Sequence, residues 1–417
     1  MAYWFHRNPL KATSPVTFEL AGVSTNEATR KIFSDLRQHR NKLLELLTDP
    51  NHDKNTLDKT SNDYFSLLIG LMKPLEEGET ENKLRQAVKF KWTNTLLGNT
   101  PTEQQDAVYE MACMAINLAL WYTKHSAKFA AKEEVDMEEA KNVHKCLRMA
   151  AGTELAPRLT GDPNKDTGPA DTDSRVLDAY INQCTAEAQE VTLARAIELK
   201  HSAGLIAALA NETGQLFKRA DDALASLDAK IVGKWRKYFQ LKSDFYIAHA
   251  HCYNAESLLA QDKCGEAIRG LQEGIKCYDK AAETCKEYAS TKGPGTQARP
   301  LNHLFFRRLG PVMKRTLDKC ERENGLIYHQ KVAFDPPILE LKATYGLVSP
   351  EDYKPPELSP LWSVEVYKKM DSKMAPKPGP QLPGEKEEKP KDLPPVKEKE
   401  VPMSDKDPKN ASGCVVS

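Results

Sequence analysis

Apolar residues recur at helical spacing through most of the chain. The first such stretch begins near Asn26 and carries leucines from Leu36 to Leu47. Positions on one face of an α-helix repeat every three to four residues, so this spacing predicts an amphipathic helix. The same pattern predicts further helices over 60–75, 102–132, 138–152, 174–230, 234–261, 265–288 and 304–324. The chain is therefore expected to be mainly α-helical.

Two of these helices form a pair with a short connection. Residues 234–261 and 265–288 meet at Asp262-Lys263-Cys264, and alanines recur along both. Small side chains allow two helices to approach closely, and an antiparallel helix pair with this pattern resembles a tetratricopeptide hairpin. Only about one such repeat is visible. The sequence thus predicts a tetratricopeptide-like helical core.

The remaining segments divide the chain into regions. Residues 1–25 indicate an extended lead-in with the option of a short strand pair, and 153–173 read as an exposed loop rich in proline and glycine. Residues 327–362 are expected to be extended and to wrap back over the helices. From 371 to 413 prolines recur and large apolar residues nearly vanish, which predicts a disordered tether. The expected organisation is a helical domain over 1–370, a tether over 371–413 and a terminal motif over 414–417.

Composition narrows the class of protein. The chain has 59 basic and 59 acidic residues, so no strong field favours nucleic acid. Its nine cysteines include no C-x-x-C pair, which favours reduced thiols in the cytosol. No apolar run approaches the length needed to cross a bilayer. We expect a cytoplasmic monomer.

The last four residues are Cys414-Val415-Val416-Ser417. A cysteine followed by two aliphatic residues and serine matches the C-a-a-X prenylation motif, and serine in the last position favours a farnesyl group. The motif predicts farnesylation of Cys414, with the carboxyl methylation that accompanies such processing. One lipid chain gives only marginal, reversible membrane binding. Peripheral association with a membrane is therefore expected.

Sequence signatures of enzymes are missing. The chain contains no G-x-S-x-G, H-E-x-x-H, P-loop or dinucleotide fingerprint. His249, His251 and Cys252 are close in sequence, but residues two apart point to different sides of a helix, which disfavours a metal site. We expect no catalytic residues, no metal and no cofactor other than the covalent lipid.

Four segments resemble the Bro1-domain family. They are Trp4–Lys11, Gln104–Val108, Cys184–Val191 and Glu321–Tyr328. The resemblance covers residues 1 to about 370 and implies an elongated, boomerang-shaped helical domain. It also implies a partner, because members of this family bind the C-terminal helix of Snf7-type ESCRT-III subunits (charged multivesicular body protein 4).

The resemblance places an apolar binding groove at three residues. These are Thr192, Leu205 and Leu209, and the two leucines are four residues apart and share one helix face. Such a face suits a groove that receives a partner helix. Periodicity alone favours the other interpretation, in which both leucines belong to the core.

Two further surfaces are candidates. Lys141, Lys145 and Arg148 form a basic stripe on the predicted helix 138–152, where the resemblance implies contacts with acidic residues of the ESCRT-III helix. A solvated face without a partner is the alternative. Tyr328 follows the apolar pair Leu326-Ile327 and is either a core wedge or an exposed docking residue.

Together these features predict a membrane-associated adaptor that binds ESCRT-III and acts in membrane remodelling or repair, at endosomes or at the nuclear envelope. A second hypothesis is a prenylated signalling scaffold that recruits partners through proline-rich stretches such as Leu393-Pro394-Pro395.

Overall fold

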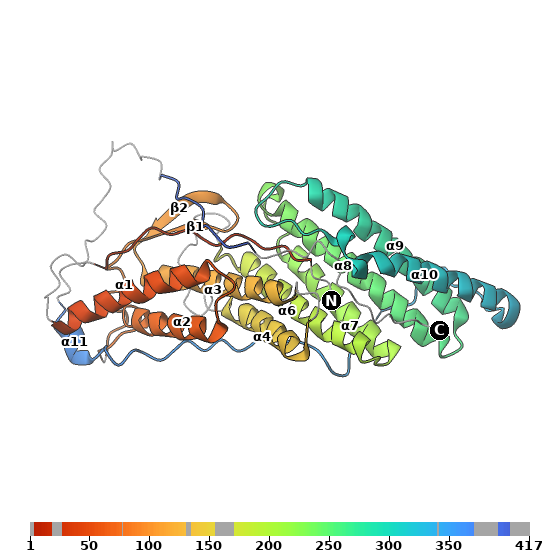
Figure 1. Cartoon of the computed structure of the whole chain (residues 1–417), viewed down its shortest axis with the longest axis horizontal. Coiled ribbons are helices and arrows are strands. Elements are labelled where there is room, and N and C mark those ends of the chain that lie inside the picture. Colours follow the sequence, from red (N-terminus) through yellow and green to blue (C-terminus); the bar gives the residue numbers. More distant parts are fainter. Residues whose placement is uncertain are drawn as a thin grey trace.

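The computed structural model describes residues 4–18, 27–76, 78–130, 135–154, 171–339, 342–370 and 391–400. The molecule is elongated, with α1 and α2 near one end and the long helices α8, α9 and α10 at the other (Figure 1). The predicted mainly α-helical class is confirmed. The helices are α1 (Glu27–Leu47), α2 (Lys54–Ile69), α3 (Ala107–Ala130), α4 (Met137–Thr153), α6 (Ser174–Glu198), α7 (Ala203–Ala223), α8 (Ala229–Leu259), α9 (Cys264–Ser290), α10 (Leu304–Glu323) and α11 (Val364–Lys368).

Helix α3 is the central helix of the N-terminal half. Its side chains are buried on nearly every side, from Ala107 to Ala127. A helix that is apolar all around is stable only inside a core, where neighbouring helices cover each face. Helices α1, α2 and α4 pack against α3 and supply this cover.

Helices α6, α7, α8 and α9 pack in sequence order, each against the next. The predicted turn between α8 and α9 is confirmed at Asp262, which adopts a left-handed conformation with φ of 57°. Gly214 of α7 faces α8, and a Cβ atom there would lie 2.9 Å from the side chain of Ile247. The absence of a side chain at this position lets the two helices approach closely.

The predicted helical block 174–230 is interrupted between α6 and α7, a break that the prediction did not include. Helix α6 ends at Glu198, Lys200 adopts φ of 54°, and Ser202 then caps α7 by accepting a hydrogen bond from the amide of Leu205 at 3.4 Å. The signal was present in the sequence, because serine is a favoured N-cap residue. Gly204 lies inside the first turn of α7.

A β-hairpin replaces the predicted start of the helix at 102. Strands β1 (Phe90–Asn94) and β2 (Gly98–Gln104) pair antiparallel, and α3 begins only at Ala107. Pro101 lies within β2 and does not open the helix. Among the described residues β2 is an edge strand of a two-stranded sheet, and an edge strand tolerates a residue without an amide hydrogen. On the other side of β1, Thr13 forms an isolated bridge to Trp92. The extended lead-in is therefore attached to the sheet.

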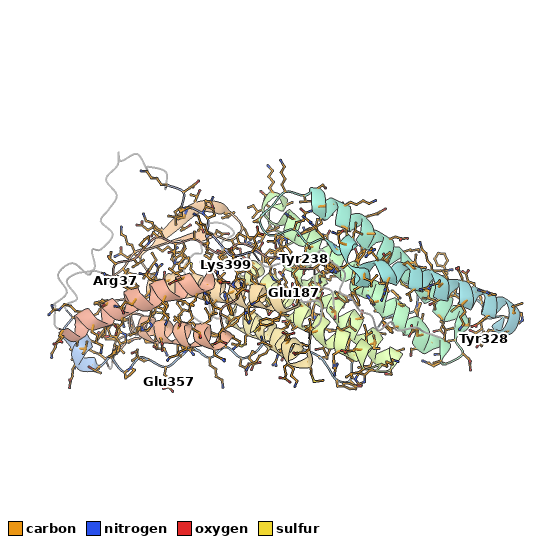
Figure 2. The ribbon with its side chains drawn as sticks, in the orientation of Figure 1. Arg37, Glu187, Tyr238, Tyr328, Glu357 and Lys399 are labelled. Carbon is orange, nitrogen blue, oxygen red and sulfur yellow. The ribbon has the colours of Figure 1, made fainter. Side chains whose placement is uncertain are left out.

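A buried ion pair joins the start of the chain to the C-terminal half. The Arg7 guanidinium donates to both carboxylate oxygens of Glu187 on α6, at 2.8 and 2.7 Å. The hydroxyl of Tyr238 on α8 donates to the same carboxylate at 3.0 Å, and Figure 2 labels Glu187 and Tyr238 near the middle of the molecule. Removing one partner of such a pair leaves an uncompensated buried charge, so this network holds three separate segments together.

The segment after α10 runs back along the body, as predicted. Residues 342–362 pass the ends of α4, α6 and α7 and reach α2, where the Trp362 indole donates to the carbonyl of Leu67 at 2.8 Å. The predicted tether, residues 371–413, has one described part and one part outside the described residues. Residues 391–400 are extended and lie on the N-terminal half, whereas the rest of 371–413 lies outside the described residues.

Candidate functional site

The residues predicted to bind a partner lie on three neighbouring helices. Helix α4 carries Lys141, Lys145 and Arg148, α6 carries Thr192, and α7 carries Leu205 and Leu209. Helix α4 packs against α6, and α6 packs against α7. Positions up to 68 residues apart in the sequence are thereby brought onto one side of a helical layer.

Residues 342–351, which we name the strap, cross this layer. At α4 the guanidinium of Arg148 donates to the carbonyl of Ser349 at 2.9 Å and forms an ion pair with Glu351 at 3.1 Å. The amide of Glu351 donates back to the carbonyl of Arg148 at 3.0 Å. Gly152 makes this approach feasible, because a Cβ atom there would lie 2.0 Å from the Glu351 carbonyl oxygen.

At α6 the strap is held by one side chain. The amide of Gln189 donates to the carbonyl of Gly346 at 2.8 Å, and its oxygen accepts from the amide of Val348 at 2.9 Å. Gln189 is itself buried. A glutamine that pairs with both a backbone acceptor and a backbone donor acts as a neighbouring β-strand would, so the strap is fixed in register on α6.

The strap covers two of the predicted groove residues. Gly346 has φ of +82°, and a Cβ atom there would lie 3.3 Å from Thr192 and 3.4 Å from Leu209. Leu209 is 1% exposed and Leu205 is 8% exposed, so both pack in the core. The groove that the resemblance implies therefore offers little apolar surface by itself, and both leucines are core residues, as helix spacing alone favoured.

Exposed apolar groups at this site come from the strap. Tyr345 is 58% exposed and Leu347 is 57% exposed. The Tyr345 hydroxyl lies 3.4 Å from the Nδ1 atom of His201 at the α6–α7 junction. Neither residue was among the predicted binding residues. The signal that could have found them is a pair of large apolar residues flanking a glycine within an otherwise polar, proline-containing segment.

In the basic stripe on α4, one residue contacts the strap and the two lysines are exposed. Arg148 is committed to the strap, while Lys141 is 64% exposed and pairs with Glu138 of its own helix at 2.6 Å. Lys145 is exposed and forms no salt bridge within the described part of the chain. Exposed ion pairs between residues of one helix contribute little free energy, so both lysines are free to meet an acidic partner.

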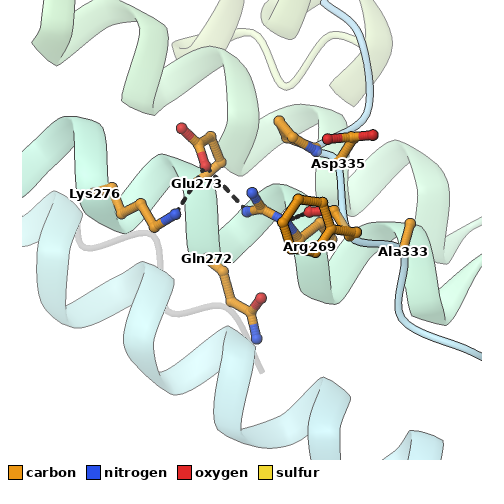
Figure 3. Close-up of a pocket in the computed structure, with 8 residues that line it drawn as sticks. Arg269, Gln272, Glu273, Lys276, Ala333 and Asp335 are labelled. Atoms are coloured by element: carbon orange, nitrogen blue, oxygen red, sulfur yellow. Dashed lines mark hydrogen bonds and ion pairs between the residues drawn. The ribbon is translucent and has the colours of Figure 1, made fainter.

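The second predicted surface lies at the end of α10. Residues Asn324–Tyr328 form a short π-helix, in which Leu326 is 74% exposed and Ile327 is 67% exposed, while Tyr328 is half-buried and packs against the core. The apolar surface here thus belongs to the pair before the tyrosine. A pocket nearby on α9 is bordered by Arg269, which donates to the Phe334 carbonyl at 2.8 Å and pairs with Glu273 at 3.0 Å (Figure 3).

Several cysteine side chains, which could be chemically reactive if they were exposed, are packed in the core. Cys146, Cys252 and Cys285 have pKa values raised to about 12 by burial, which keeps these thiols protonated and unreactive. Within the described residues no cluster of histidine, cysteine and carboxylate side chains is arranged to hold a metal ion. Cys414 lies outside the described residues. None of the helices that the structure describes combines the length and apolar character that crossing a bilayer requires.

Comparisons with known proteins agree with this architecture. A family model described as BRO1-like domain matches residues 18–370. The BRO1 domain-containing protein BROX of Danio rerio is 51% identical over 420 residues, which is 100% of either chain. Two solved structures share the fold at low identity. One, on endosomal targeting by the Bro1 domain, has a TM-score of 0.63 and 18% identity and covers 88% of this chain and 98% of its own. The other, the ALIX BRO1 domain in complex with CHMP4C, has a TM-score of 0.64 and 19% identity. The match covers 88% of this chain and 100% of that structure's chain.

These findings confirm the resemblance that the four sequence segments indicated. The match spans the helical layer, the strap and α11, and it ends where the described body ends. The chain therefore belongs to the family of proteins with a BRO1-like domain, as a non-catalytic member.

Proposed function

We propose that this protein is an adaptor that binds the C-terminal helix of ESCRT-III subunits of the charged multivesicular body protein 4 type. The observation that carries the proposal is the convergence of α4, α6, α7 and the strap on one surface. That surface combines exposed apolar groups, Tyr345 and Leu347, with the exposed cations Lys141 and Lys145. An amphipathic helix with an apolar stripe and an acidic edge has matching chemistry. The relative of known structure, ALIX, forms a complex with CHMP4C through its BRO1 domain.

We also propose that Cys414 carries a farnesyl group. The lipid would hold the protein reversibly at a membrane, since one chain provides marginal affinity. Binding to ESCRT-III assembled on the same membrane would add a second contact, and two tethered contacts reinforce each other through effective concentration. Endosomal membranes are the first site to examine, because the BRO1 domain of a structural relative targets endosomes.

The scaffold hypothesis receives less support. Its best proline motif, Leu393-Pro394-Pro395, is part of the described segment on the body, where the Leu393 amide donates to the carbonyl of Asn99 at 3.0 Å. A polyproline ligand must be free to enter an aromatic groove. This attachment disfavours recruitment through that motif.

The charge-reversal variant Lys145→Glu tests the proposed partner surface. Titration with a synthetic C-terminal helix of a charged multivesicular body protein 4 subunit should show affinity reduced about threefold to tenfold and a weaker dependence on salt, since rim charges steer association. The matched control is Lys286→Glu, an exposed lysine on α9 at a distance from this surface. Equal affinity in both variants and the wild-type protein would refute the basic edge.

A test of the apolar part of the surface needs a substitution at an exposed position. Leu205 and Leu209 are unsuitable, because a polar residue in the core would report on folding. Leu347→Asp replaces an exposed side chain of the strap, and Leu301→Asp, at a residue 44% exposed, is its control. Loss of peptide binding in the first variant alone supports the proposal, whereas retained binding contradicts it.

A further inference from the structure

Ten residues near the C-terminal end of the chain lie against the N-terminal half. Residues 391–400, which we name the docked tail, run beside the β1–β2 hairpin (Figure 1). The amide of Leu393 donates to the carbonyl of Asn99 at 3.0 Å, and the hydroxyl of Thr100 donates to Asp392 at 2.7 Å. The docked tail is thus bonded to β2 at its first residues.

The contacts continue to the end of the segment. Val396 is half-buried and packs against the main core. The amide of Lys399 donates to the carbonyl of Thr48 at 2.9 Å, and its ammonium pairs with Asp49 at 2.7 Å (Figure 2 labels Lys399). Leu393 and Val396 are both half-buried, whereas Pro394 and Pro395 between them are exposed.

A buried cation on α3 depends on this segment. Lys124 is 7% exposed, and its ammonium forms an ion pair with the carboxylate of Glu398. The other oxygen of Glu398 accepts from the amide of Leu10 at 2.8 Å. Within the described part of the chain no other carboxylate pairs with Lys124. An ammonium that is buried when the segment is in place is stabilised by a carboxylate beside it, so α3 favours an anionic group at this position.

We propose that Leu10, Thr48-Asp49, Asn99-Thr100 and Lys124 form a binding site for an extended peptide with one acidic residue, and that its ligand is residues 391–400 of the same chain. Backbone bonds at both ends hold the peptide in an extended form, the apolar core surface that contacts Val396 takes an aliphatic side chain, and Lys124 selects a carboxylate at the position of Glu398. No local pattern indicates this site, because Lys124 lies within a helix whose other positions are mainly apolar.

Docking has a consequence for the lipid, which rests on the proposed farnesylation. With the docked tail in place, 13 residues separate Glu400 from Cys414, and they span at most about 45 Å. Released, the 43 residues after Met370 could span about 150 Å. Docking would therefore keep the body close to the membrane and turn the hairpin face toward it.

Hydrogen–deuterium exchange on the full chain, produced without the lipid, tests the site. Glu398→Lys places a second cation beside Lys124 and should release the docked tail. The amides of Leu10, Leu393 and Lys399 should then exchange at least about tenfold faster than in the wild-type protein, because their hydrogen bonds open. The control Glu400→Lys makes the same charge change at an exposed position and should leave the exchange unchanged.

A second variant tests the docked tail without changing the charge beside Lys124 on α3. Val396→Asp removes the apolar contact without placing a charge beside Lys124, and it should accelerate the same amides. Equal exchange of these amides in the wild-type protein and both variants would overturn the proposal. Because the protein in this experiment carries no lipid, its outcome does not depend on whether Cys414 is farnesylated, and a failure of either proposal can be recognised separately.

Discussion

At the scale of single residues, the histidines of the C-terminal half behave as core residues. The ring of His249 lies between Phe245 and Phe305, with ring centroids 4.8 and 4.9 Å away. Neither of its nitrogens has a hydrogen-bond partner among the described residues, and burial lowers the pKa of this histidine to about 3. The imidazole is therefore neutral in the folded protein at physiological pH.

This burial predicts a loss of stability in acid. The unfolded chain binds a proton at His249 with a pKa near 6.5, while the folded protein does so only near pH 3. Protons thus favour the unfolded state as the pH falls below about 6.5. His249→Phe should remove this term, so that its free energy of unfolding falls less between pH 7.5 and pH 5, by about 2 kcal/mol relative to the wild-type protein.

Urea unfolding at the two pH values measures the difference. The same substitution at half-buried His39 on α1 controls for adding an aromatic ring. Parallel losses of stability in the wild-type protein and His249→Phe would contradict the assignment.

At the scale of elements, the strap depends on one glycine. Gly346 combines φ of +82° with close contacts to Thr192 and Leu209, so an added methyl group is both strained and crowded. Gly346→Ala should lower the free energy of unfolding by about 1–2 kcal/mol. It should also accelerate exchange of the Val348 amide, whose hydrogen bond to Gln189 holds the strap.

Gly78 provides the matched control, with φ of +90° and nothing within 4 Å of an added Cβ atom. Gly78→Ala introduces the backbone strain without the crowding. It should lose less stability and leave the Val348 amide unchanged. An identical result for the two variants would show that the strap does not depend on this contact.

Elements differed in how well the sequence predicted them. Helices with a clear apolar face, such as α1 and α9, were predicted to within a few residues, because their apolar side chains recur at helical spacing. The hairpin was missed, since β2 is mostly exposed and shows no alternation of apolar and polar residues. A strand of this kind is stabilised by pairing with β1, which a local pattern does not record.

At the scale of the whole molecule, the proposed farnesyl group predicts how the protein partitions between membrane and solution. Replacing Cys414 with serine should move the protein from the membrane fraction to the supernatant in cell fractionation, because the proposed lipid would supply the membrane contact. The lysines of 371–413 are matched by acidic residues, nine of each, and add no net attraction to anionic lipids. Cys277→Ser, at a half-buried thiol on α9, is the control. Equal membrane content of wild-type protein and Cys414→Ser would refute the anchor.

The candidate site was predicted in part. The resemblance placed the candidate residues on α4, α6 and α7, and the exposure of each of them depends on contacts from distant parts of the chain. Arg148 pairs with Glu351, 203 residues later, and Leu209 is covered at Gly346. Lys145 stayed exposed, as a charged residue on the outer face of an amphipathic helix usually does.

The sequence by itself determined the helical class, the order of the long helices, the α8–α9 turn and the family, because these are recorded in local periodicity and short motifs. The tertiary structure alone decided which face of each helix stays open. The strap closes the groove over Leu209, and residues 391–400 neutralise a cation buried on α3. Both contacts join segments more than a hundred residues apart, and burial is set by such neighbours in space, which no local pattern contains.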